Sequence, residues 1–240
     1  MALDAATLLT LWTGLEPAMV EHARFPPRGL DSSVWSTVAA GKVARPKVAN
    51  GARGVGLLAC SRAEAWLAVT DDHPVDVVAG LTQVAVRGAW ATEKLLYQRL
   101  DLPWPFIDRH WVLHSVNNHA LAQAAGVWER AWDSDPTALG GARALTDAAA
   151  FDAALPVPVN RGSWLLVTVD ATHTLGVYTA EADLGGGVPA SAAEAYTAAT
   201  LDDLFRSTLA DAIDLRHRYG PGCTAQPGGD GVVIPCFTGG

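Results

Sequence analysis

The chain has 240 residues, half of them hydrophobic, and a formal net charge of -8 at pH 7. This apolar content is sufficient for a sizeable core and excludes an intrinsically disordered chain. The negative charge argues against binding of nucleic acid or of an anionic membrane as the main task, and no apolar run is long enough for an integral membrane segment.

The N-terminal segment is apolar but has Asp4 where a signal peptide has Lys or Arg, so it is interpreted as a helix of a cytoplasmic protein. Asp4 is expected to cap a helix that runs to Trp12. Gly14 and Pro17 are expected to interrupt that helix before a second helical piece at residues 19–23.

Strand patterns follow the N-terminal helix. Residues 34–43 and 55–60 are predicted strands. Ser61 and Glu64 have the spacing of a capping box, which opens a short helix that carries Trp66 and Leu67 inward. Further strands are predicted over residues 81–88, 93–102, 109–117, 120–132, 163–170 and 173–182.

Two polar steps, Asn117-Asn118 and residues 170–173, are predicted hairpin turns. The Ala-rich segment from Ser134 to Asn160 is expected to be a loop with one short helix that covers or narrows the mouth of any cavity. A second capping box, Ser191 to Glu194, opens a long amphipathic helix that ends near Arg218. Its buried face is expected to carry Leu201, Leu204, Phe205, Thr208, Leu209, Ala212 and Ile213, and its polar face Asp202, Asp203, Arg206, Asp211 and Asp214.

Four segments carry a family resemblance. LPWPFIDRHWVLHS, from Leu102, has a Pro-aromatic-Pro step, a polar loop and an aromatic-rich strand. Gly162-Ser163-Trp164 and Thr174 to Tyr178 precede ADLGGGVPAS, which leads into the long helix. In this order they resemble the START-type lipid-binding domains of the helix-grip (Bet v 1-like, SRPBCC) superfamily, over residues 34–218.

The resemblance implies an α+β helix-grip fold, in which a curved antiparallel sheet wraps around a long C-terminal helix and encloses an apolar cavity. Residues 1–218 would form this single domain and residues 219–240 a Gly/Pro-rich tail. The resemblance favours Trp111, Leu113 and Ser115 as the inward set of their strand. Some sterol-binding relatives carry Arg at the position of Ser115.

Glu129 and Arg130 are adjacent on a strand, so they face opposite sides and one of them is expected to point toward the interior. A buried charge needs a partner, and Arg99 is a candidate partner for Glu129. Many START-like domains keep such a charged pair to orient a polar ligand head. The full set of expected cavity residues is Tyr97, Arg99, Trp111, Leu113, Ser115, Glu129, Trp164, Leu166, Tyr178, Leu201, Phe205, Thr208 and Leu209. For each aromatic residue, a place in a filled core is the alternative, since periodicity does not distinguish a filled interior from a hollow one.

No metal, cofactor or catalytic residue is expected. His110 and His114 share a strand face, but four residues at roughly 3.3 Å each separate them by about 13 Å, too far for one ion. Asp108-Arg109 is interpreted as a structural pair. Cys60 is expected to be buried. Cys223 and Cys236 flank the tail and either pair or stay reduced, as is usual in the cytoplasm.

Three functions remain open. The leading one is binding or transfer of a hydrophobic small molecule, for example a lipid, with transient membrane contact. The second is an enzyme of the polyketide cyclase/aromatase kind, which shares the fold and steers an aldol closure with a few polar cavity groups. The third is an interaction module with a filled core.

Overall fold

The computed structural model describes residues 3–49, 51–72, 80–185 and 190–237, apart from the side chains of 190, 192–194, 196 and 197. Its helices are α1 (Ala5–His22), α2 (Ser32–Ala39), α3 (Arg62–Thr70), α4 (His119–Ala125), α5 (Leu139–Arg143), α6 (Ala148–Ala153) and α7 (Ala190–Arg218), with a 3-10 turn η1 (Pro136–Ala138). Its strands are β1 (Ala52–Leu58), β2 (Leu81–Arg87), β3 (Lys94–Leu100), β4 (Arg109–Asn117), β5 (Trp128–Ser134), β6 (Leu155–Pro156), β7 (Val159–Thr168), β8 (Thr174–Asp183), β9 (Gln226–Pro227) and β10 (Val233–Ile234).

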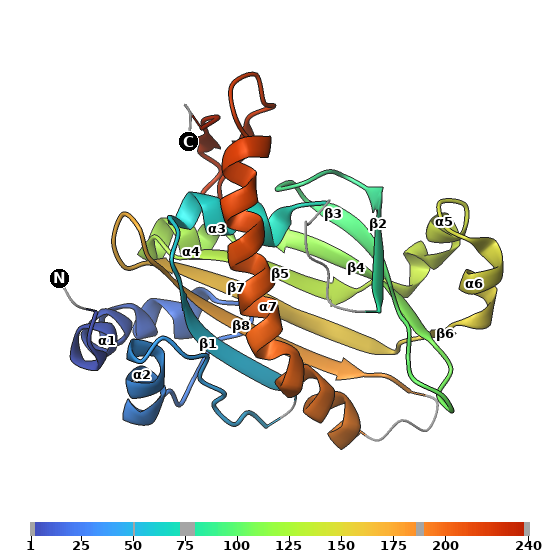
Figure 1. Ribbon diagram of the computed structural model, residues 1–240, viewed down its shortest axis with the longest axis horizontal. Coiled ribbons are helices and arrows are strands. Elements are labelled where there is room, and N and C mark those ends of the chain that lie inside the picture. The colour runs from blue at the N-terminus through green and yellow to red at the C-terminus, as the bar shows by residue number, and fades with distance from the viewer. Residues whose placement is uncertain (1–2, 50, 73–79, 186–189, 238–240) are drawn as a thin grey trace.

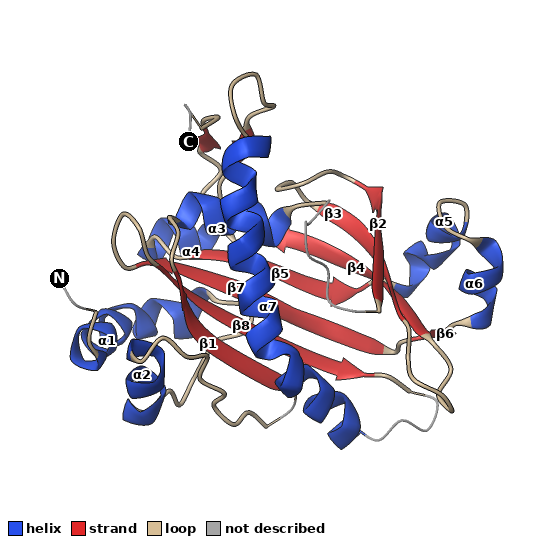
Figure 2. Ribbon diagram, in the orientation of Figure 1, coloured by secondary structure: helices blue, strands red, loops and turns tan. Residues whose placement is uncertain are grey.

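An eight-stranded sheet forms the centre of the described structure (Figure 2). Its main strands follow the order β1-β8-β7-β5-β4-β3-β2, and each adjacent pair is antiparallel. The two-residue strand β6 joins β4 in parallel. Figure 1 shows α7 crossing one face of this sheet. The expected α+β architecture, a curved antiparallel sheet with a long C-terminal helix, is confirmed.

Side chains of alternate parity along each strand build a separate core on each face of the sheet. Trp164 and Leu166 of β7 face α3 and α7, whereas Leu165 and Val167 face α1, α2 and α4. Farther along the second face, Tyr97 and Val112 pack with Ala142 of α5. The sheet therefore has helices on both faces, and strands such as β4 are buried on both sides.

α1 is one continuous helix, so the predicted interruption at Gly14 and Pro17 is wrong. The expected cap is confirmed, because Asp4 Oδ1 accepts a hydrogen bond from the Thr7 backbone N–H at 2.8 Å. Pro17 itself is exposed, and the helix is held in place by the side chains of Leu8, Trp12 and Met19, which are buried.

The strand predicted over residues 34–43 is also wrong, since this segment forms α2. Asp31 caps the helix by accepting from the Ser33 N–H at 2.9 Å. Val34, Trp35 and Val38 then lie on one buried face, a spacing that suits a helix as well as a strand. Tertiary packing thus outweighs the strand propensity of valine.

The predicted strand over residues 120–132 begins instead as helix α4. The Asn118 side chain accepts from the Leu121 N–H at 3.2 Å, and Gly126, at a φ of 65°, ends the helix. A helical connection therefore replaces the expected hairpin at Asn117-Asn118. The expected turn at residues 170–173 is confirmed between β7 and β8, where the Val169 N–H donates to the His173 carbonyl at 3.0 Å.

The segment from Ser134 to Asn160 forms η1, α5, α6 and β6 rather than a loop with one helix. Phe151 of α6 packs on Tyr97 and His110, with ring centroids 5.7 and 4.5 Å away. These partners lie on the face of β3 and β4 opposite α7. The segment therefore covers the outside of the sheet, and the expected position over a cavity mouth is not observed.

Helix α7 extends over 29 residues, close to the prediction. It begins at Ala190, and the side chains of residues 192–194 in the expected capping box lie outside the described ones. Two assignments of its faces are corrected: Ile213 is 46% exposed, and Asp211 is only 2% exposed. The capping box at α3 is confirmed in full, and Trp66 and Leu67 are buried as expected.

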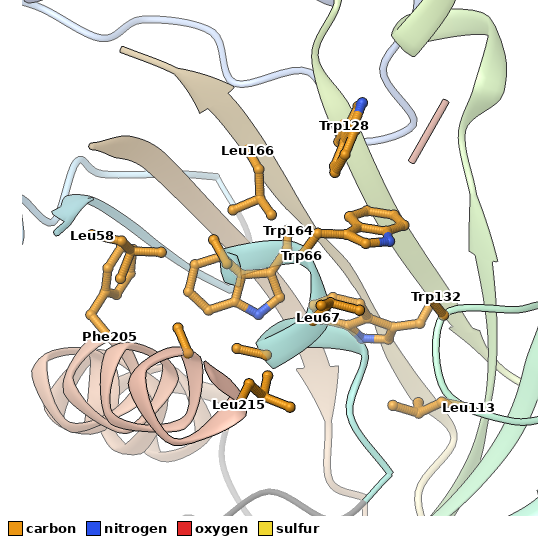
Figure 3. Close-up of a cluster of buried hydrophobic side chains, with 14 of the residues drawn as sticks. Leu58, Trp66, Leu67, Leu113, Trp128, Trp132, Trp164, Leu166, Phe205 and Leu215 are labelled. Atoms are coloured by element: carbon orange, nitrogen blue, oxygen red, sulfur yellow. The ribbon is translucent and has the colours of Figure 1, made fainter. Parts of the chain in front are cut away.

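The tail after α7 returns to the body of the protein. Cys223 and Cys236 form a disulfide that closes it into a loop. The backbone of Gly228 and Gly229 lies against the Trp128 ring, where an added Cβ would be 2.8 and 2.5 Å from ring or Cβ atoms. Figure 3 shows Trp128 beside Trp66 of α3 in the same cluster. The tail thus completes the core at the end of α3.

None of the described helices has both the length and the apolar character that a membrane crossing requires. Likewise, the described part of the chain contains no group of three His, Cys, Asp or Glu side chains arranged to hold a metal ion.

Candidate functional site: a cavity between the long helix and the sheet

The floor of the site is a set of cross-strand rows on the face toward α7. In one row, Lys94 of β3 pairs with Ser115 of β4, which pairs with Trp132 of β5. In the next row, Asn117 pairs with Arg130. That row continues through Trp164, Tyr178 and Gly54 on β7, β8 and β1. The register therefore places large aromatic and cationic side chains side by side on one surface.

Glycines occupy this face on the side of β1 and β8: Gly54 ends the row just described, and Gly56 pairs with Gly176 in another row. An added Cβ at Gly56 would lie 2.9 Å from the Phe205 ring of α7, and those at Gly54 and Gly176 would lie 3.0 and 3.2 Å from it. Phe205 also packs on Trp164 with ring centroids 5.0 Å apart. Figure 3 shows Phe205 reaching from α7 toward Leu58 and Trp164. On this side α7 is seated directly on the sheet, because the glycines leave room for the ring.

Toward β2 to β5, α7 and the sheet enclose a cavity of about 300 Å³, whose lining also includes residues of β7 and β8. Its strand wall includes Trp111, Trp132 and Trp164, and its helix wall includes Leu201 and Thr208. The remaining lining residues are Ala68, Val69, Asp71, Leu81, Gln83, Lys94, Leu96, Gln98, Leu100, Leu113, Ser115, Arg130, Asn160, Tyr178, Ala180, Ala182, Leu184, Thr200, Leu204, Ser207 and Asp211. The cavity is thus mainly apolar and aromatic, with a few polar groups.

Seven of the expected cavity residues are brought together around this space: Trp111, Leu113, Ser115, Trp164, Tyr178, Leu201 and Thr208. Phe205, Leu166 and Leu209 do not line it. Phe205 and Leu166 belong to the filled core beside the cavity, and Leu209 packs against that core.

Tyr97 and Arg99 lie on the opposite face of β3. Tyr97 pairs with Val112, and both residues belong to the core beneath α5 and α6. Arg99 forms an ion pair with Asp101 at 3.0 Å. The prediction for β3 is therefore wrong by one residue: the side chains of Leu96 and Gln98 line the cavity, and those of Tyr97 and Arg99 point to the other face.

Glu129 also faces away from the cavity, and no ion pair joins it to Arg99 among the described residues. Its fully buried carboxylate accepts from the Arg24 N–H at 3.0 Å and from Asn118 Nδ2 at 2.6 Å. These donors belong to the segment after α1 and to the cap of α4. Glu129 therefore fastens the N-terminal helices to the sheet, and its neighbour Arg130 is the residue that points inward.

The charged residues of the cavity are ones that sequence reasoning missed. Lys94 and Arg130 lie on the sheet, and Asp71 and Asp211 lie on the walls formed by α3 and α7. Arg218, near the end of α7, forms ion pairs with both carboxylates and is 2.8 Å from Asp71. The sequence gives one signal for Arg130: it follows Glu129 directly on a strand, so the two side chains point to opposite faces of the sheet.

Burial changes the chemistry of these groups. It lowers the pKa of the Lys94 ammonium, an effect that the nearby Asp72 carboxylate opposes. It lowers the pKa of Arg130 to about 10, so the guanidinium stays charged at neutral pH. It raises the pKa of the Tyr178 hydroxyl to about 12, so this group is a neutral hydrogen-bonding group near neutrality. The cavity can therefore combine apolar contact with a few oriented polar contacts.

No protein-family model and no curated protein matches this sequence. Among solved structures, human STARD10 aligns over 82% of this chain and 84% of its own, with a TM-score of 0.50 at 9% identity. The chain has the START fold. A STAR-related lipid transfer protein from Xanthomonas axonopodis is 22% identical over 71% of this chain and 90% of its own, with a TM-score of 0.49. Human StAR-related lipid transfer protein 5 is 14% identical over 88% and 98%, with a TM-score of 0.47.

The START fold accounts for the position of the cavity, since the helix-grip arrangement lays α7 across the sheet. The resemblance noted in the sequence is thereby confirmed at the level of the fold. Identities this low carry no ligand from those proteins to this chain, because one fold can serve many functions.

Proposed function

We propose that the protein binds a hydrophobic small molecule in the cavity between α7 and the sheet. The observation that carries the proposal is a space of about 300 Å³ with three tryptophans in its walls. Ligand pockets are commonly apolar spaces of about 300–1,000 Å³ with a few placed polar groups. A volume at the lower end of that range favours a compact ligand over a two-chain lipid. The hollow interior also favours this function over an interaction module with a filled core.

A direct test uses a compact, neutral, environment-sensitive fluorophore, 6-propionyl-2-(dimethylamino)naphthalene. It should bind saturably and raise the melting temperature, because a ligand that prefers the folded state stabilises it. Thr208→Trp and Ser115→Trp should weaken binding at least tenfold, since each adds volume to the cavity wall. Arg206→Trp is the matched control, because this exposed side chain lies on the same helix outside the cavity.

Two results would contradict the proposal. Saturable binding that ignores both cavity substitutions would move the site elsewhere. Failure of this probe and of a panel of fatty acids and sterols to bind would remove the carrier function.

We also propose that the protein makes transient contact with a membrane surface. Support comes from the β3–β4 loop, where Trp104, Phe106 and Ile107 are 92%, 46% and 51% exposed. Clustered exposed apolar side chains mark interaction surfaces. Co-sedimentation with phosphatidylcholine vesicles should fall for Trp104→Ala and not for Leu145→Ala, which removes an apolar side chain exposed elsewhere. Equal retention of the two variants would reject this contact.

A cytoplasmic location remains a prediction. The Cys223–Cys236 disulfide weighs against it, because structural disulfides are rare in the cytosol.

A further inference from the structure

We propose that the ligand of this cavity carries an anionic group, of which a carboxylate is the simplest case, held by Lys94 and Arg130 on the sheet wall. The inference rests on the proposed function and adds the chemical class of the ligand: a compact aromatic or aliphatic acid.

The two cations occupy neighbouring rows of one surface. Lys94 pairs with Ser115, and Arg130 pairs with Asn117, two residues farther along the same strand β4. Residues two apart on a strand point to the same face. All of Lys94, Ser115 and Arg130 line the cavity. One group of a ligand can therefore meet both cations from the same side.

Both cations are buried, with exposures of 5% for Lys94 and 3% for Arg130. A charge removed from water is costly unless a partner of opposite charge or several hydrogen bonds compensate it. Water cannot supply that compensation at full strength in a small apolar cavity. The charges that surround the two side chains therefore decide what the cavity accepts.

Arg130 has only neutral partners among the residues that the structure describes. Its Nη1 donates to Asn117 Oδ1 at 2.6 Å, and its Nη2 donates to the Thr92 carbonyl at 2.7 Å. No carboxylate of the described residues lies within ion-pair distance of it, and the Asp72 and Glu93 carboxylates favour its charged form only from farther away. A guanidinium has five N–H donors in a planar fork that matches a carboxylate, and these two hydrogen bonds use two of them.

Lys94 has one carboxylate partner. Its Nζ donates to the Thr70 carbonyl at 2.7 Å and forms an ion pair with Asp72. An ammonium has three donors, so in the described part of the chain one remains beyond these two bonds. The hydroxyl of Ser115, in the same row as Lys94, likewise has no hydrogen-bond partner among the described side chains and backbone. Among the described residues, Asp72 is therefore the one carboxylate within ion-pair distance of either Lys94 or Arg130.

The carboxylates on the opposite wall have another cation as their ion-pair partner. Asp71 and Asp211 are both in ion pairs with Arg218, which lies outside the cavity lining. Two carboxylates share one guanidinium there, so the wall keeps some negative charge, and the Asp71 carboxylate opposes through space the lowering of the Lys94 pKa by burial. Among the described residues, neither carboxylate forms an ion pair with Lys94 or Arg130, so those two cations keep room for a ligand group. An anionic ligand group fits the sheet wall, and its apolar body then lies beside Trp132 and Trp164, the row neighbours of Ser115 and Arg130.

The test compares two probes of the same shape, 2-naphthoate and neutral 2-naphthamide, by calorimetric titration. Hydrogen bonds to a charged partner are stronger than neutral ones, so the acid should bind roughly tenfold or more tightly than the amide. Lys94→Met and Arg130→Met should each reduce that ratio toward one while changing amide binding little. Arg99→Met is the matched control, because this cation lies on the outer face of the same strand β3 as Lys94 and should leave the ratio unchanged.

A second variant tests the same charges without any ligand. Ser115→Asp places a carboxylate between Lys94 and Arg130, so it should raise the melting temperature relative to Ser115→Asn and abolish the preference for the acid. No stabilisation relative to Ser115→Asn would overturn the cationic site.

The outcomes separate the two proposals. Equal affinity for acid and amide, with both weakened by Thr208→Trp, would overturn the anionic ligand and leave the apolar cavity in place. A preference for the acid that survives both Met substitutions would also overturn it. Binding of neither probe would remove the proposed function together with this inference.

Discussion

The two sides of α7 meet the sheet in different ways. Over β1 and β8 the helix rests on glycine backbone, and Phe205 fills the space against Gly54, Gly56 and Gly176. Over β2 to β5, and over the parts of β7 and β8 nearest to them, it faces tryptophans and leucines across an open volume. The same helix therefore has one filled side and one hollow side. The contrast shows how a cavity can persist in a folded interior: tight contact on one side holds the helix while the other side stays open.

Phe205→Ala should disrupt the packing of α7 on its filled side, over β1 and β8. Removing a tightly packed ring from this position should cost about 3–5 kcal/mol of unfolding free energy, because the surrounding backbone cannot collapse into the space. Denaturant titration measures this loss. A loss below about 1 kcal/mol would mean that Phe205 is not the anchor of α7.

A matched pair of leucines compares the two sides directly. Leu58 is buried beside Phe205, whereas Leu113 lines the cavity. Leu58→Ala should fall in the upper part of the range of about 2–5 kcal/mol, and Leu113→Ala near its lower end, because one flank of Leu113 has no packing partner to lose. Equal losses in the same titration would contradict the hollow side.

Gly56→Ala should destabilise the protein by about 1–3 kcal/mol, although alanine is ordinarily favoured over glycine in a strand. The reason is that its Cβ would lie 2.9 Å from the Phe205 ring. Combining it with Phe205→Leu should recover part of the loss, which a double-mutant cycle would detect. Additive losses would show that the two positions do not compete for space.

The smallest expected effect concerns Cys60, whose thiol should not react with an alkylating reagent in the folded protein. Its thiol is buried at the end of β1 on the filled side, and burial raises its pKa to about 12. Since the thiolate is the reactive form, N-ethylmaleimide at pH 7.5 without reductant should leave Cys60 unlabelled until the protein is unfolded. Mass spectrometry before and after denaturation measures this. Labelling of the folded protein at the rate of a free thiol would show that the filled side opens readily.

Much of the fold was predictable because the relevant signals are local. The capping box at Ser61 and Glu64, the turn at residues 170–173 and the 3–4 spacing from Leu201 each report on one element. The errors arose where long-range packing decides. The segments that form α2 and the start of α4 have apolar spacings that also suit strands.

The parity of β3 was not predictable for a physical reason. Leu95, Leu96 and Tyr97 follow one another and all are buried, because α5 and α6 cover the outer face while the cavity lies on the inner face. A strand covered on both sides loses the alternation of polar and apolar residues that would fix its orientation. Only the register with β4 shows that Lys94 faces inward.

The cavity charges were missed for the same reason. Glu129 and Arg130 are adjacent, so the sequence indicates that they face opposite sides without indicating which side. Gly54 and Gly56 under Phe205 were equally hidden, since their role depends on a helix about 150 residues away in the chain.

The disulfide in the tail after α7 contributes to the free energy of unfolding. The chain that leaves the helix is joined to itself by the Cys223–Cys236 bridge, with a sequence separation of 13 residues, and its glycines cover Trp128. Closing a loop of this size removes freedom from the unfolded chain equivalent to about 3 kcal/mol in the chain-entropy description. That contribution disappears where thiols are kept reduced. The stability of the fold that encloses the cavity is therefore coupled to the redox state of its surroundings.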